Sequence, residues 1–285
     1  MTRPFVRLAW AAAAATYLLI VLGAVVRITG SGMGCGDDWP LCHGRLVPLF
    51  DLPTFIEWSH RLVAAIVSAL VVATAVVGWR GAPDAIPVAP RRAAYWAVAL
   101  LVIQVLLGAV TVKLELPPWT VILHLGTAML LFAALLVAAR GSPVLHTSRF
   151  AWGAVALSFV TVLFGALTAN LGAASACLGF PLCNGQVIPE GNYLQAVHWI
   201  HRLLAYGLTG YVVVWAWRRP SLGPRVVLAL VVLQVALAAV MVVSALPQEL
   251  QAAHVAVGTA IWGAVVVVAT RNETAPEPET SGAAH

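Results

Sequence analysis

Residues 23–44 read GAVVRITGSGMGCGDDWPLCHG, and residues 165–185 read GALTANLGAASACLGFPLCNG. Both stretches continue from an apolar run and contain a pair of cysteines. The second cysteines of the two pairs, Cys42 and Cys183, are 141 residues apart. The chain therefore contains one unit twice, which predicts two similar halves.

The repeat continues beyond the cysteines. FIEWSHRLVA (55–64) is matched by AVHWIHRLLA (196–205) at the same offset. A later pair of positions repeats at an offset of 130 residues, with Gln104 and His124 in the first half and Gln234 and His254 in the second. Each half thus offers two histidines. We interpret the two glutamines, which fall inside apolar runs, as partners in interhelical hydrogen bonds.

The composition is that of a polytopic membrane protein. Hydrophobic residues make up 61% of the chain and charged residues 9%, whereas a soluble domain has about 25% charged residues. Since a membrane span needs about 20 largely apolar residues, the sequence predicts eight spans, at residues 7–27, 55–79, 92–113, 119–140, 150–169, 195–217, 224–245 and 248–270. The fold class is an all-α integral membrane protein with eight transmembrane helices in two tandem, pseudo-symmetric four-helix bundles.

The repeat divides the chain into two halves and a tail. We expect a first four-helix half at residues 1–145, a second at 146–271 and a disordered tail at 272–285, because the tail is rich in Pro, Glu, Thr, Ser and Ala. The first apolar run resembles a signal peptide. It is long, however, and it continues into the repeat, so we expect a retained span.

Basic residues beside the spans predict the orientation. Eleven arginines flank the ends on one side: Arg3, Arg7, Arg80, Arg91, Arg92, Arg140, Arg149, Arg218, Arg219, Arg225 and Arg271. Three basic residues flank the other: Arg27, Arg45 and Lys113. The positive-inside rule then places both termini in the cytoplasm and both cysteine loops outside. This asymmetry accounts for the basic pI, so we predict no nucleic-acid partner.

The two cysteine pairs lie in these outward loops. Cys35 and Cys42 enclose six residues, and Cys177 and Cys183 enclose five. An oxidising compartment favours a disulfide in each loop. Zinc is the alternative, although the spacing is wider than the usual C-x-x-C arrangement. A thiol-exchange role for the first pair stays open, because its surroundings are the more acidic.

Four histidines fall in the first turns of the even-numbered spans: His60, His124, His201 and His254. An ionisable side chain at membrane depth is a functional candidate by default. A single buried histidine is as often a polar residue bonded to its neighbours, but two duplicated pairs at one level indicate ligands. Two trans imidazoles suffice for haem, whereas a bare metal ion needs more ligands. We therefore predict a bis-histidine haem site in each half.

Three arginines lie near these sites. Arg61 and Arg202 directly follow His60 and His201, and Arg27 ends the first span. Because arginine pairs well with carboxylates, all three are candidates for contacts with haem propionates. Snorkelling of these side chains to the membrane surface is the alternative.

The repeat is broken at one position. Glu57 lies three residues before His60 and therefore on the same helix face, while the second half has His198 there. A carboxylate beside a metal-bound macrocycle can relay protons or stabilise a developing cation. His198 is a candidate to bond a propionate. The alternative for Glu57 is an interfacial carboxylate. The asymmetry predicts a reactive first site and a second site that is a fixed redox group.

With GCGDDWPLC, EWSHR, His124, the second cysteine pair and the histidines of the second half in this order, the chain resembles the haem A synthase family over about residues 8–270. A cysteine pair in each half is typical of its bacterial type. The resemblance implies an oxidoreductase that converts the C8 methyl of haem O to the formyl of haem A by two successive hydroxylations via haem I, with water or dioxygen as the oxygen source.

The resemblance also implies roles for residues. His60 and His124 would bind the iron of the substrate haem O, and His201 and His254 the iron of a haem B cofactor. Glu57 would be the catalytic residue. Both cysteine pairs, Cys35 with Cys42 and Cys177 with Cys183, would be disulfides.

The implied setting is a bacterial cell membrane, where the protein would serve haem A biosynthesis for terminal oxidases. A haem O synthase is the expected partner that delivers substrate, and a quinone is a candidate electron acceptor. The rival interpretation is a non-catalytic bis-histidine dihaem cytochrome that passes electrons from quinol. Both haems at one depth disfavour it. A transporter is disfavoured because two four-span halves run in the same direction and not as an inverted repeat.

Overall fold

A computed structural model of the chain describes residues 2–82, 85–140 and 149–270. These residues form eight α-helices and no sheet: α1 (Arg3–Ile28), α2 (Leu52–Arg80), α3 (Val88–Lys113), α4 (Pro118–Arg140), α5 (Arg149–Asn170), α6 (Tyr193–Arg218), α7 (Leu222–Val243) and α8 (Gln248–Ala269). The predicted all-helical fold is confirmed. The predicted tail at 272–285 and the boundary between residues 145 and 146 lie outside the described residues.

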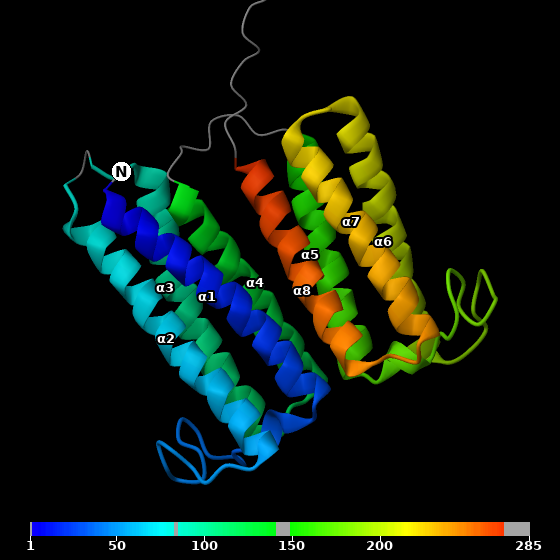
Figure 1. The fold of residues 1–285 in the computed structure, drawn as a ribbon, viewed down its shortest axis with the longest axis horizontal. Helices are drawn as coiled ribbons and strands as arrows, with labels where there is room; N and C mark the ends of the chain where they lie inside the picture. The colour runs from blue at the N-terminus through cyan, green and yellow to red at the C-terminus, as the bar shows by residue number, and fades with distance from the viewer. Residues whose placement is uncertain (1, 83–84, 141–148, 271–285) are drawn as a thin grey trace, which may run out of the picture.

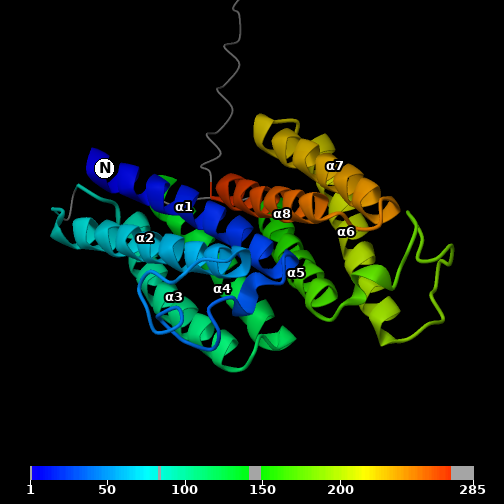
Figure 2. The ribbon, with the colours of Figure 1, turned by 60° about the horizontal axis from the view of Figure 1, so that its bottom comes forward.

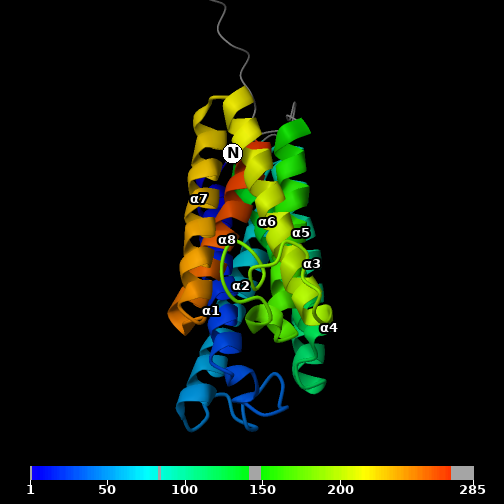
Figure 3. The ribbon, with the colours of Figure 1, turned by 90° about the vertical axis from the view of Figure 1, so that its right-hand side faces the viewer.

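The helices stand in two groups of four (Figure 1). α1–α4 form one group and α5–α8 the other, and the groups meet through α1, α4, α5 and α8. All eight run roughly side by side when the molecule is viewed from the second group (Figure 3). The loops that contain the cysteines, residues 29–51 and 171–192, lie at one end of the molecule, which we call the cysteine-loop end. The N-terminus lies at the other end.

Seven of the helices are long and apolar enough to cross a membrane, α6 being the exception. α6 is less apolar because its first turns contain His198, His201 and Arg202. The prediction of eight helices is thus confirmed, but α6, which contains the predicted span at residues 195–217, is not among the helices apolar enough to cross a membrane. The protein is a multi-pass membrane protein.

The two groups join in a shared apolar core. Met129 and Phe132 of α4 and Trp262 and Val265 of α8 are buried there. The indole Nε1 of Trp262 donates a hydrogen bond to the carbonyl of Met129 at 2.8 Å. This burial fixes α4 against α8 and sets the distance between the two histidine pairs.

The repeat extends to the helix ends. α2 and α6 begin after Asp51 and Asn192, whose side chains accept hydrogen bonds from backbone N–H groups of the first turn. Such N-caps satisfy donors that have no partner within the helix. Because the caps are alike, α2 and α6 begin at matching positions, and His60 and His201 fall at one level.

Candidate functional site

The four predicted ligand histidines lie near the cysteine-loop end, one on each even-numbered helix. His60 on α2 and His124 on α4 are close enough to interact electrostatically, and so are His201 on α6 and His254 on α8. The structure therefore brings together the pairs that the sequence predicts.

Each of the four imidazoles has a buried Nδ1 atom without a hydrogen-bond partner among the described residues. Burying a polar atom without a partner costs free energy. Four such atoms at duplicated positions indicate that the rings are arranged for a ligand that the protein does not itself supply.

Two glutamines orient one imidazole of each pair. The side-chain nitrogen of Gln104 lies 3.1 Å from Nε2 of His124, and that of Gln234 lies 3.2 Å from Nε2 of His254. The interpretation of these glutamines as interhelical partners is confirmed. The identity of the partner, a candidate ligand, was not predicted.

Glycines on neighbouring helices leave room for the imidazoles. A Cβ atom at Gly23 on α1 would lie 3.1 Å from Cε1 of His60, and one at Gly165 on α5 would lie 2.9 Å from Cε1 of His201. These glycines are not among the predicted site residues. The signal was available, because both begin the repeated stretch and a glycine inside an apolar helix marks a close approach.

Glu57 is buried on α2, with 3% of its surface exposed. One carboxylate oxygen accepts a hydrogen bond from the backbone N–H of Cys35 at 2.8 Å, and the other pairs with the Arg61 guanidinium at 2.5 Å. The sequence predicts that Glu57 shares a helix face with His60, and both lie on α2; the burial of the carboxylate was not predicted. Its two protein partners tie it to the first cysteine loop.

His198 takes the equivalent place on α6, with 6% of its surface exposed. Its Nδ1 lies 3.0 Å from the carbonyl of Ala173, and Nε of Arg202 donates to its Nε2 at 3.2 Å. A carbonyl only accepts, so Nδ1 carries the hydrogen and Nε2 accepts. His198 is therefore a neutral imidazole with both nitrogens bonded.

Arg61 and Arg202 also bind the cysteine loops. Arg61 donates to the carbonyls of Asp38 and Leu41 at 2.7 and 2.5 Å. Arg202 donates to the equivalent carbonyls of Gly179 and Leu182, both at 2.9 Å, and to that of Cys177 at 2.6 Å. Each arginine thus holds its loop over the helix that carries the histidine.

Both cysteine pairs are disulfides. Cys35 is bonded to Cys42 and Cys177 to Cys183. The predicted disulfides are confirmed, and the zinc alternative is wrong because the thiolates that it needs are not available.

The histidine pairs suit haem better than a bare metal ion. Among the described residues, no group of three or more His, Cys, Asp or Glu side chains could hold an ion. Two imidazoles suffice when a porphyrin supplies the other four ligands. The unpartnered nitrogens are consistent with such a group.

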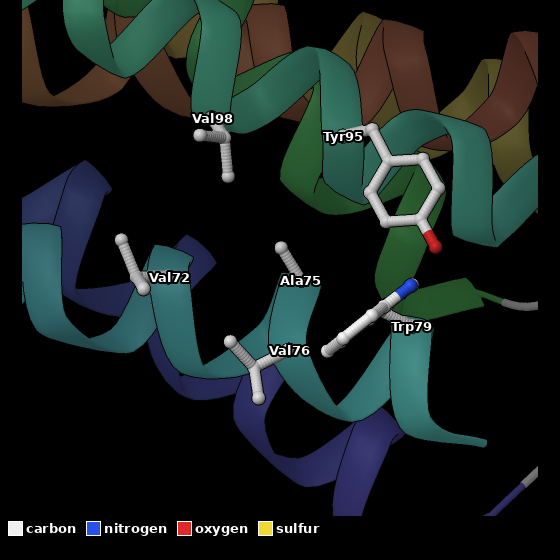
Figure 4. A pocket seen from close by; sticks show the side chains of 6 residues that line it. All are labelled: Val72, Ala75, Val76, Trp79, Tyr95 and Val98. Carbon is white, nitrogen blue, oxygen red and sulfur yellow. The ribbon is translucent and has the colours of Figure 1, made fainter.

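An open groove of about 350 Å³ lies between α2 and α3 (Figure 4). Val72, Ala75, Val76 and Trp79 of α2 line it, with Tyr95 and Val98 of α3. It contains none of the predicted site residues, and its lining is almost entirely apolar.

Comparison with known proteins agrees with this picture. The family model COX15-CtaA, described as cytochrome oxidase assembly protein, matches residues 6–52 and 50–266. A protein of Symbiobacterium thermophilum named "Heme A synthase" is 34% identical over 278 residues, which cover 87% of this chain and 89% of the relative.

Two further relatives have the same name. That of Shouchella clausii is 36% identical over 190 residues, 61% of this chain and 62% of the relative. That of Bacillus licheniformis is 31% identical over 215 residues, 70% of each. Each match is longer than either half of the chain, so the likeness extends into both halves.

Proposed function

The chain belongs to the COX15-CtaA family of cytochrome oxidase assembly proteins, and on that premise we propose that it is a haem A synthase, an oxidoreductase that converts haem O to haem A. The observation that carries the proposal is the duplicated pair of histidines with unpartnered buried nitrogens. A single carboxylate, Glu57, lies one turn from one pair and has no counterpart beside the other.

We assign the first pair to substrate and the second to cofactor. His60 and His124 bind the iron of haem O, and His201 and His254 bind the iron of haem B. The haem B, when bound, supplies a redox centre. The chain supplies two imidazoles from two helices in each half, with Gln104 and Gln234 orienting one imidazole of each pair.

Glu57 is assigned the catalytic role. Its carboxylate is buried and is held by Arg61 and the Cys35 peptide, so it needs little reorganisation to act. It accepts a proton or stabilises positive charge that develops on the substrate. His198 has no equivalent capacity, because it is neutral and its one accepting nitrogen is already bonded to Arg202, whereas a carboxylate keeps free lone pairs.

Four residues remain proposed propionate contacts. Three of them, Arg61, Arg202 and His198, already make hydrogen bonds within the protein. To bind a propionate, each would have to make a further hydrogen bond or give up one of these. Among the described residues, the Arg27 guanidinium donates to one neutral side chain, that of Gln251. By these assignments, the half at residues 1–145 holds substrate and the half at 146–271 holds cofactor.

The proposed setting is a bacterial cell membrane, since the relatives are bacterial. The excess of arginine at the end opposite the cysteine loops supports cytoplasmic termini and external loops. A haem O synthase that delivers substrate, and a quinone that accepts electrons, are the proposed partners.

Pigment analysis tests the function. The protein is produced together with a haem O synthase, and extracted haems are identified by pyridine haemochrome spectra and mass analysis, with membranes that contain only the haem O synthase as the control. We expect haem A only when this chain is present, and haem B in the purified protein. Unchanged haem O in a protein that binds both haems would refute the enzyme and favour the dihaem cytochrome.

A further inference from the structure

Arg27 belongs to the first half of the chain, yet its guanidinium contacts the second. It lies in the last turn of α1, and its Nη2 donates to Oε1 of Gln251 on α8 at 3.4 Å. Gln251 precedes His254 by three residues, so the two share a face of α8. α1 and α8 lie side by side (Figure 2).

The register of α1 against α8 is fixed on both sides of His254. Beyond His254, the hydroxyl of Tyr17 donates to the carbonyl of Ala256 at 3.1 Å. Before it, the amide nitrogen of Gln251 donates to the carbonyl of Leu246 at 2.8 Å, which leaves its oxygen for Arg27. The segment of α8 that carries His254 is therefore held against α1.

The charge of Arg27 lacks a carboxylate partner in the part of the chain that the structure describes. The ion pairs there join Arg61 to Glu57 and Lys113 to Asp37. A guanidinium has five N–H donors, and one long bond to a neutral amide satisfies few of them. Because arginine is suited to bidentate carboxylate binding, the half-buried Arg27 is ready for an anion.

Arg27 also stands close to the first site. Gly23, one turn earlier on α1, is the residue that packs against His60. The repeat places Ala169 at the position of Arg27 in the second half, so that position has no charge there. The first half thus contributes a cation at the seam between the halves, and the second half does not.

We propose that Arg27 is the cationic partner of a propionate of the haem held by His201 and His254, so that a first-half residue sets the charge around the second-half centre. This inference rests on the proposed function, which supplies the haem and its carboxylates. A cation beside a haem favours the less positive, ferrous iron. Arg27 therefore raises the midpoint potential of the second centre.

Redox titration of the haem-loaded protein tests this assignment. The parent is the His60→Ala variant, in which only the second-half haem is expected, and Arg27→Gln or Arg27→Lys is added to it. At a fixed solution potential, R27Q should lower the ferrous-to-ferric ratio about tenfold, or about 59 mV for a one-electron couple. R27K keeps the charge and should stay within about twofold of the parent.

The matched control is Lys113→Gln, which removes a cation from the same end of the molecule without touching α8. It should leave the ratio unchanged. An unchanged ratio in R27Q, or an equal fall in K113Q, overturns the proposal. Loss of haem in R27Q supports the proposal if R27K retains haem, and overturns it if both lose haem, since packing and not charge is then responsible.

The readout separates this inference from the proposed function. A protein that converts no haem O but shows the R27Q shift would refute the activity and keep the assignment of Arg27. A His60→Ala parent that binds no haem would refute both the second-half haem site and the inference.

Discussion

Glu57 and His198 occupy the same place in the two halves, but only Glu57 is charged. Both are buried, both contact the cysteine loop of their half, and both bind the arginine one turn later on the same helix. Glu57, however, contributes a carboxylate. His198 is neutral and has both ring nitrogens bonded. In both halves an arginine binds the cysteine loop in the same way, and only the residue one turn before that arginine differs.

The difference shows that this position of the duplicated unit can change in charge while the loop contacts around it stay the same. Arg61 and Arg202 bind equivalent loop carbonyls, so the loops are held whichever residue stands at the central position. That position can therefore be acidic in one half and neutral in the other without loss of the fold. We expect the chemistry in the half with the buried acid.

Replacing one of the proposed haem-ligand histidines should have the largest effect. His201→Ala should remove the resident haem B entirely, whereas His60→Ala should spare it and remove the substrate haem, because each imidazole is a ligand in its own half only. Haem stoichiometry of the purified variants measures this. Retention of both haems in both variants would contradict the bis-histidine assignment.

Neutralising the central residue should have the next largest effect. Glu57→Gln keeps the shape and should keep both haems, while the rate of haem A formation falls about 100-fold or more. The matched variant His198→Gln should lower the rate less than about tenfold, since no charge is lost. Conversion of haem O by membranes of each variant is the measurement, and full activity of Glu57→Gln would sink the catalytic assignment.

Removing the two disulfides should affect activity differently in the two halves. Replacing either pair by serines should cost roughly 2 kcal/mol of stability. Activity should fall further for Cys35→Ser with Cys42→Ser, because the Cys35 peptide N–H holds Glu57. Thermal unfolding and haem A formation, measured on both double variants, test this comparison. Equal activity of the two would argue against a link between the first loop and Glu57.

The smallest expected effect concerns the helix caps. Hydrogen bonds from Thr54 lower the pKa of Asp51 below its ordinary 3.8. Its cap therefore stabilises α2 above that pH and is lost as the pH falls through the lowered pKa, whereas the cap of α6, Asn192, does not titrate. Asp51→Asn should remove this acid sensitivity, a change in Tm of roughly 1 °C between pH 5 and pH 3. An identical pH dependence in the variant would show that the cap does not contribute.

Much of the fold could be predicted, because a long apolar run in the sequence is enough to identify a membrane helix. Six of the predicted spans lie entirely within a helix of the structure, and the span at 248–270 exceeds α8 by one residue, since apolar runs of that length have few alternatives in lipid. α7 ends at Val243, two residues before the predicted end. Ala245 and Leu246 then take positive φ angles of 59° and 62° and turn the chain into α8. Pro247 signals a break between the helices, but neither Ala245 nor Leu246 is a residue type that favours a positive φ.

The site was predictable in its residue types and not in its contacts. The pairing of His60 with His124 followed from the repeat and the level of each histidine. The bond between Glu57 and the Cys35 peptide did not, because 22 residues of chain separate the two groups and the loop path joins them only once it is folded.

The sequence by itself determined the number of helices, the duplication, the cysteine pairs, the depth of the histidines and the replacement of Glu57 by His198. All of these depend on composition and spacing along one chain. Only the tertiary structure decided that Arg61 and Arg202 bind the loops, that glycines face the imidazoles, and that Arg27 crosses to α8. Such contacts join residues far apart in the chain, and the packing angle and register of helices set them, which no local pattern encodes.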